Sequence, residues 1–140
     1  MKNKAFSISL VIIFVFTMLA PPILAATNSY SFTMQHRLVD GSKNGRFMSL
    51  SKGQATIRGS HYQSSALEGA VGPNTVHYTL YNKTSGNSFG TISSTPTADG
   101  NRTYFSGKYS GLGGGTKYYL LIWKTHVDGR TIKGTGTVSN

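Results

Sequence analysis

The sequence has no cysteine and few carboxylates, and both shortages limit the chemistry open to it. Its 140 residues include 14 Lys and Arg but only 4 Asp and Glu, which gives a formal charge of +10. Without cysteine there is no disulfide, no thiol nucleophile and no thiolate metal ligand. Mechanisms that need paired carboxylates have very few residues to use. No helical period of ten or more residues appears after the N-terminal segment, which disfavours helical folds.

The N-terminal segment has the parts of a secretory signal peptide. Lys2 and Lys4 precede an uncharged apolar run over residues 5–20, and Pro21-Pro22 and small residues follow. We predict cleavage after Ala25, with the next residue as the alternative position. The competing interpretation is an uncleaved membrane anchor, because a spanning helix needs about 20 apolar residues. Pro21-Pro22 would stop such a helix early and therefore favours the signal peptide.

The remaining chain, residues 26–140, is predicted to form one domain. Loss of Lys2 and Lys4 leaves 12 basic and 4 acidic side chains on 115 residues, formally +8. A chain of this size buries roughly 65% of its unfolded surface, enough for one two-layer core. Export without disulfides is typical of a Gram-positive bacterium, so we expect an extracellular, secreted protein with no transmembrane segment once the signal is removed.

Period-two alternation recurs along residues 26–140 and predicts strands. Eight short segments qualify: 30–38, 47–51, 54–61, 75–82, 89–93, 102–109, 116–127 and 131–138. Glycine-containing or turn-forming breaks separate them at 40–41, 52–53, 64–74, 85–87, 96–100, 111–115 and 128–129. This spacing predicts an all-β fold, an antiparallel two-sheet sandwich of about seven to eight strands.

Each of the four acids, Asp40, Glu68, Asp99 and Asp128, directly precedes a glycine. An acid before glycine is a turn composition, because the short side chain bonds local amides while glycine takes the left-handed conformation. We therefore place the carboxylates on separate loop tips, where two of them do not meet easily. The sequence accordingly predicts a protein that is not an enzyme.

One nine-residue segment resembles a known family. In Leu112-Gly-Gly-Gly-Thr-Lys-Tyr-Tyr-Leu120, the order of Leu, a turn ending in Gly-Thr, and Tyr resembles fibronectin type III and related immunoglobulin-like domains. Gly114 stands where that family usually has proline. The resemblance implies an immunoglobulin-like sandwich in which Tyr118 anchors a corner by bonding to backbone upstream.

The resemblance also implies a register for the strand that follows. If Tyr118 points inward, Leu120 and Ile122 do too, and the alternate side chains face outward. The predicted ligand-binding stripe consists of Tyr119, Leu121 and Trp123, with His77 and Tyr81 on the neighbouring strand. We expect Thr131, Lys133 and Thr135 to flank its other side. The structural alternative is that Trp123 packs in the core, or that a loop or a second copy covers the stripe.

The opposite sheet is predicted to carry the basic surface. It would expose Arg37, Arg58 and Lys108 with Tyr104 among hydroxyls, and Lys133, on the flank of the stripe, completes the set of predicted basic residues. A cationic secreted protein is attracted to anionic polymers, although the same charge also serves solubility alone. The basic residues are scattered and match no nucleic-acid-binding motif, which disfavours a dedicated nucleic-acid partner.

The remaining chemical candidates are weak. The four histidines, His36, His61, His77 and His126, show no metal-ligand spacing, so no metal and no cofactor are predicted. No Gly-x-Ser-x-Gly motif is present, and the glycines at 111–115 lack the lysine and helix of a phosphate loop. We read them as a flexible turn.

The sequence as a whole predicts a secreted, non-enzymatic protein that adheres to anionic or glycan polymers of the cell envelope or extracellular matrix. A cationic antibacterial or toxin-like protein has the same size, charge and export signal. A self-assembling matrix protein, which would use the exposed stripe for homo-oligomer contacts, is a further alternative.

Overall fold

The computed structural model describes residues 25–140, and the predicted signal peptide lies outside this range except for Ala25. Every regular element in the described residues is a strand. They are β1 (Thr27–Met34), β2 (Leu38–Asp40), β3 (Met48–Ala66), β4 (Val76–Asn82), β5 (Ser88–Ser94), β6 (Thr103–Lys124) and β7 (Arg130–Ser139). All pairings are antiparallel, which confirms the predicted all-β sandwich. No helix long and apolar enough to cross a membrane occurs in residues 25–140.

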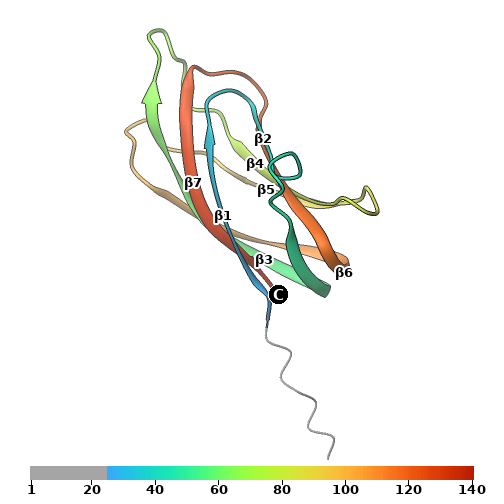
Figure 1. Ribbon diagram of the computed structural model, residues 1–140. Helices are drawn as coiled ribbons and strands as arrows, with labels where there is room; N and C mark the ends of the chain where they lie inside the picture. Colours follow the sequence, from blue (N-terminus) through green and yellow to red (C-terminus); the bar gives the residue numbers. More distant parts are fainter. Residues whose placement is uncertain (1–24) are drawn as a thin grey trace, which may run out of the picture.

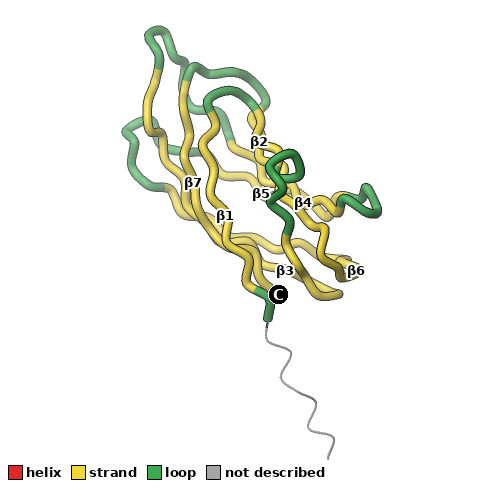
Figure 2. Tube along the Cα trace, in the orientation of Figure 1, coloured by secondary structure: helices red, strands yellow, loops and turns green. Residues whose placement is uncertain are grey.

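The two layers of the sandwich belong to one continuous sheet with the strand order β1-β7-β3-β6-β4-β5, and β2 also pairs with β6. The first layer contains β1, β7, residues 55–66 of β3 and residues 103–109 of β6. The second layer contains β5, β4, residues 116–124 of β6, and β2. The long strands β3 and β6 pass through both layers (Figure 1; Figure 2).

Two predicted breaks are bends inside strands, and this finding corrects the sequence analysis. The breaks at 52–53 and 111–115 face each other, because Lys52 pairs with Gly113 and Gly53 with Leu112. The pairing register shifts just after Gly53, and Gly53 and Gly111 have positive φ. Glycine at a bulge lets a strand bend without losing its partner. Gly111–Gly115 is therefore not a free turn but the corner where β6 passes between layers.

The first predicted strand, in contrast, divides in two. Residues 35–37 form a bend, so His36 lies outside any strand and Leu38 begins β2. β1 pairs with β7 in the first layer, whereas β2 pairs with β6 in the second. The bend therefore carries the chain from one layer to the other.

The corner tyrosine behaves as the family resemblance implies. The side chain of Tyr118 is buried, and its hydroxyl accepts a hydrogen bond from the backbone N–H of Gly114 at 3.1 Å. Leu120 and Ile122 are buried as well, so the inward register predicted for this strand is confirmed.

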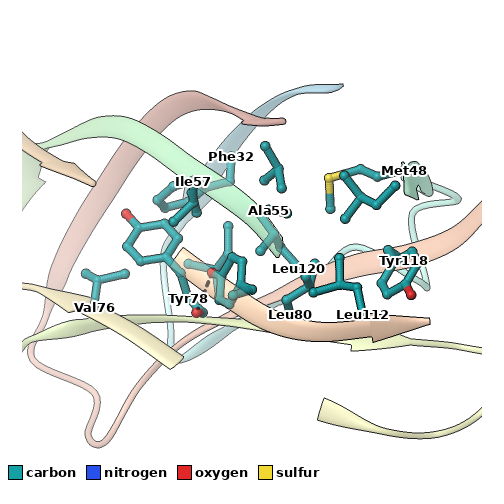
Figure 3. Close-up of a cluster of buried hydrophobic side chains, with 14 of the residues drawn as sticks. Phe32, Met48, Ala55, Ile57, Val76, Tyr78, Leu80, Leu112, Tyr118 and Leu120 are labelled. Carbon is teal, nitrogen blue, oxygen red and sulfur yellow. Dashed lines mark hydrogen bonds between the residues drawn. The ribbon is translucent and has the colours of Figure 1, made fainter. Parts of the chain in front are cut away.

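The core between the layers is built largely of aromatic and branched side chains (Figure 3). Tyr78, Tyr109 and Ile57 are fully buried, and the Tyr109 hydroxyl donates to the backbone carbonyl of Tyr78 at 2.8 Å. Glycine makes room for the large rings. A Cβ on Gly136 would lie 2.2 Å from the backbone oxygen of Arg58 and 2.6 Å from the Tyr30 hydroxyl. With the rings packed inside, the alternate residues of each layer form two broad outer faces.

Candidate binding faces

The outer face of the second layer carries all five residues predicted for the ligand-binding stripe. The register places His77 opposite Trp123 and Tyr81 opposite Tyr119, with Thr79 opposite Leu121 between them. We call this surface the aromatic face. Its five predicted residues are half-buried, and Thr79 is buried at 6% exposure. The alternative in which Trp123 belongs to the core between the layers is therefore wrong.

Two cross-strand stacked pairs form the centre of the aromatic face. The ring centroids of His77 and Trp123 lie 4.2 Å apart at 28°, and those of Tyr81 and Tyr119 lie 5.7 Å apart at 17°. Neighbouring strands are separated by about 4.8 Å, so the paired rings stand side by side. Phe47 meets Tyr119 edge to face and extends this aromatic row.

Hydrogen bonds beneath the rings fix their orientation. Trp123 Nε1 donates to Thr79 Oγ1 at 3.1 Å, and Thr79 Oγ1 lies 2.8 Å from Thr91 Oγ1. His77 Nδ1 lies 2.8 Å from Ser93 Oγ. Side chains held in this way lose little further freedom when a ligand binds. Thr79, Thr91 and Ser93 were not singled out by the sequence, because alternation marks the outward positions but not the hydrogen bonds between them.

Partial burial favours the neutral forms of two rings of the aromatic face, His77 and Tyr119. Burial lowers the pKa of His77. Burial, followed by the nearby Asp40 and Tyr81, raises the pKa of Tyr119. Each stacked pair therefore contains a ring whose neutral form is favoured, which suits contact with an uncharged ligand surface.

The far flank of the aromatic face differs from the expectation. Leu38 pairs with Trp123 and Asp40 with Leu121, so β2 lies there instead of Thr131, Lys133 and Thr135. The last strand, β7, belongs to the first layer. The short β2 was missed because the bend at 35–37 contains no glycine or proline to mark it. Leu38 is 52% exposed and enlarges the apolar surface beside Trp123.

The outer face of the first layer is a regular array of hydroxyl and basic side chains, which we call the basic face. Outward side chains from four paired strands, β1, β7, β3 and β6, line up in four rows across the face. Arg102, which directly precedes β6, ends one row because the pairing of His61 with Thr103 continues to Tyr62 and Arg102. The rows are Thr33, Lys133, Tyr62 and Arg102; Ser31, Thr135, Ser60 and Tyr104; Ser29, Thr137, Arg58 and Ser106; and Thr27, Ser139, Thr56 and Lys108. Ten of these sixteen residues are Ser or Thr, four are cationic, and none is acidic.

Three of the four predicted basic residues lie on this face. Arg58, Lys108 and Lys133 are exposed there. Arg37 is not, because it lies in the bend between β1 and β2, where its carbonyl accepts from the Lys124 backbone N–H at 2.8 Å. Arg102 is the cation that the sequence analysis missed. Its guanidinium lies 4.8 Å from the centre of the Tyr62 ring and donates to Ser60 Oγ at 3.0 Å.

Two open depressions lie next to each other on the basic face. One, of about 600 Å³, is lined by Arg58, Ser60, Tyr104, Ser106 and Thr135, together with Gly59, Phe105 and Gly136. The other, of about 390 Å³, is lined by Tyr62, Arg102 and Lys133 with neighbouring hydroxyls. Thr135 borders both depressions. Each therefore combines positive charge, hydroxyls and an aromatic ring.

None of the four rows of the basic face contains a carboxylate. Asp128 is buried, with its Oδ1 2.6 Å from Lys124 Nζ, and it accepts from the backbone N–H groups of Asn74 and Arg130. Burial opposes ionisation of Asp128, but these hydrogen bonds outweigh it and hold the pKa below its usual range. Asp40 and Asp99 bond to their own turns. A carboxylate engaged in this way is a poor general base.

A buried histidine cluster has the outline of a catalytic arrangement but not its electrostatics. His61 Nδ1 lies 2.8 Å from the Tyr78 hydroxyl, and His61 Nε2 lies 3.1 Å from Ser94 Oγ. Burial lowers the pKa of His61 to about 4, which makes it a weak base at neutral pH. Its Nδ1 faces a neutral phenol rather than a carboxylate. We therefore assign this cluster to the core. In residues 25–140, no three His, Asp or Glu side chains are grouped so as to hold a metal ion.

Comparison with known proteins adds no assignment. No protein-family model matches the chain, and no curated protein matches it. Among solved structures, the chain is similar to a virus-like particle of giant freshwater prawn Macrobrachium rosenbergii extra small virus, seen by cryo-EM. The identity is 12%, the match covers 99% of this chain and 93% of that chain, and the TM-score is 0.27. A TM-score of this size is not evidence of a shared fold.

Proposed function

We propose that this chain is a secreted, non-enzymatic binding protein that adheres to glycan polymers of the cell envelope or extracellular matrix through its aromatic face. The observation that carries the proposal is the pair of cross-strand stacks, His77 with Trp123 and Tyr81 with Tyr119, on one outer face. Soluble proteins seldom leave so many large rings together at the surface without a partner.

The neighbours of the rings favour a sugar over a purely apolar partner. The C–H faces of pyranose rings pack against aromatic side chains, and their hydroxyls need hydrogen-bond partners. Thr91, Ser93 and Asp40 border the stacked pairs and supply donors and acceptors beside them. Lys83 and Lys117 lie together at the end of the face next to Tyr81 and Tyr119. These lysines would favour a glycan that also carries negative groups.

The test is retention of the purified domain on insoluble glycans. We expect wild type to bind at least one of chitin, cellulose and peptidoglycan. The variant Tyr119→Ala/Trp123→Ala should bind at least tenfold more weakly, a loss of about 1.4 kcal/mol. The change removes one ring from each stack, whereas the inward residues of β6 keep the core intact. Circular dichroism and thermal unfolding would confirm that the variant is folded.

Leu67→Ala is the control, because Leu67 is a 75% exposed apolar side chain in the loop after β3 and belongs to neither face. It should leave retention unchanged. Equal retention of wild type and Tyr119→Ala/Trp123→Ala, or no retention on any of the three glycans, would overturn the proposal. Growth inhibition by the purified protein without glycan retention would favour the cationic antibacterial alternative. Concentration-dependent sedimentation without retention would favour the self-assembling one.

A further inference from the structure

We infer that the basic face is a second binding site, for an acidic polysaccharide carrying carboxylates, and that one chain bridges this polymer to the glycan on the aromatic face. The bridging half rests on the proposed function. The acidic-polysaccharide half stands on the basic face alone and is tested separately.

Charge complementarity is the first argument. Arg58, Arg102, Lys108 and Lys133 share a face that holds no carboxylate. The acids of the described chain lie elsewhere: Asp40 is in β2 beside the aromatic face, and the other three are in loops between strands. In residues 25–140 the one ion pair is Lys124–Asp128, so none of the four cations is paired with a carboxylate and their positive potential reaches solvent. An anionic partner is therefore the one that this face attracts.

The hydroxyl array narrows the class of anion. Successive outward positions on a strand are about 6.7 Å apart and neighbouring strands about 4.8 Å apart, so ten hydroxyls form a regular polar lattice. Such a lattice can exchange hydrogen bonds with a polymer rich in hydroxyls. The face carries no aliphatic side chain, so it offers little apolar surface to the interior of a lipid layer. A polysaccharide meets both requirements.

The arginines favour carboxylate as the charged group. A guanidinium presents a planar fork of donors that matches the two oxygens of a carboxylate. Arg102 is already held by Ser60 Oγ and stacked on Tyr62, so part of its ordering cost has been met before a ligand arrives. Arg58 borders the larger depression, where exposed Tyr104 can cover a sugar ring. Each depression thus offers a cation beside an aromatic surface.

The two faces cannot serve one short segment of polymer. They are the opposite outer surfaces of a two-layer sandwich (Figure 2). Layers that pack face to face are about 10 Å apart. A chain that lies on the aromatic face leaves the basic face free. A protein with two such sites links separate polymers, and retention on a matrix gains from the two contacts together.

The first experiment measures binding of fluorescent polygalacturonate in solution. Wild type should bind it at least tenfold more tightly than the same polymer after reduction of its carboxyl groups, and more tightly than single-stranded DNA of equal length. The triple variant R58Q/K108Q/K133Q should lose at least tenfold in affinity. The control R37Q/K43Q/K52Q removes the same charge from exposed positions outside the face and should lose less than threefold.

Three outcomes would overturn the acidic-polysaccharide site. Equal losses in the two triple variants would show attraction to net charge only. Equal affinity for native and carboxyl-reduced polymer would exclude carboxylate recognition. Tighter binding of DNA would assign the face to nucleic acid instead.

The second experiment tests bridging on the insoluble glycan that retains the wild-type protein. Bound wild type should capture fluorescent polygalacturonate from solution. R58Q/K108Q/K133Q should remain bound to the insoluble glycan but capture at least tenfold less polygalacturonate. Tyr119→Ala/Trp123→Ala should bind polygalacturonate in solution but no longer bind the insoluble glycan. Release of wild type by polygalacturonate would show one shared site and overturn bridging. If no solid retains the protein, the proposed function and bridging fail together, and the solution test still decides the basic face.

Discussion

His61 shows at the scale of one residue how burial and hydrogen bonding set a charge state. Its side chain has no solvent exposure, and its two ring nitrogens lie within hydrogen-bond distance of Tyr78 and Ser94. Burial lowers the pKa of His61 to about 4 from an ordinary 6.5. The folded protein therefore keeps this ring neutral at pH values where the unfolded chain protonates it.

This difference makes stability depend on pH. Between about pH 6.5 and pH 4 the unfolded chain binds a proton at His61 that the folded chain does not, so the free energy of unfolding falls as the pH falls through that range. Urea unfolding at pH 7 and pH 4.5 should show the loss in wild type and a clearly smaller loss in His61→Phe. His77, whose pKa burial also lowers, is present in both proteins.

The quantity to compare is the change in the free energy of unfolding with pH, because His61→Phe also loses two hydrogen bonds and is already less stable at pH 7. The exposed His36→Gln should keep the wild-type slope. An unchanged slope in His61→Phe would show that other groups control acid stability.

Side-chain orientation was the residue-scale feature that the sequence predicted best. Alternation with period two, fixed by one buried tyrosine, placed Tyr119, Leu121 and Trp123 outward. Arg102 was missed because its role depends on Tyr62 and Ser60, some 40 residues earlier in the chain. Arg37 was misplaced because a bend without glycine or proline removes it from the strand. The local alternation of residues sets which way a side chain points, whereas its contact partners depend on how distant strands pair.

At the scale of elements, β3 and β6 show why breaks in a pattern are ambiguous. The glycines at 53 and 111–115 interrupt alternation in the same way as a turn does. The two interruptions face each other across the ladder, so both strands bend together and stay paired. A single sequence does not reveal that coincidence, because it follows from long-range pairing. Segments predicted as four short strands are therefore two long ones.

Glycine also controls how closely β3 and β7 can cover the core. Gly59 and Gly136 are paired across these strands, and the Tyr30 hydroxyl lies against both of them. Gly136→Ala would bring a methyl group within 2.2 Å of the Arg58 carbonyl oxygen, a contact that backbone must move to relieve. We expect a loss of about 1–3 kcal/mol in the free energy of unfolding, measured by urea denaturation.

Gly72→Ala is the control, since a Cβ there meets nothing within 4 Å and the residue lies in a loop. It should leave the unfolding midpoint almost unchanged. If both variants unfold at the same urea concentration, the glycine pair does not limit packing between β7 and the core.

At the scale of the whole molecule, composition and fold divide the surface into two chemically different faces. The shortage of acids predicted a basic protein, and the strand ladder gathers four cations on one face and five ring or apolar side chains on the other. The sequence indicated both groups of residues but not their neighbours, since β2 and Arg102 join them only through the fold. Opposite placement is the feature on which the proposal of two separate polymer sites rests.

One buried ion pair closes an end of this sandwich. Asp128 joins Lys124 at the end of β6 to the backbone of Asn74, which precedes β4, and of Arg130, which begins β7. Both charged side chains are fully buried. Removing one partner of such a pair leaves the other charge buried without a partner, which lowers the free energy of unfolding by about 3–5 kcal/mol. Asp128→Ala should therefore unfold at a much lower urea concentration than wild type.

The dependence of stability on pH in acid gives a second test of the Lys124–Asp128 ion pair. Because hydrogen bonds hold the pKa of Asp128 below its usual range despite burial, the pair stabilises the fold above about pH 3.9 and loses its effect as the pH falls further. This range lies below that of His61, so the two contributions separate in a titration. Asp99→Ala, at an exposed turn with similar local hydrogen bonds, should change stability far less. Equal destabilisation by Asp128→Ala and Asp99→Ala would mean that turn bonds, not the buried pair, hold this end together.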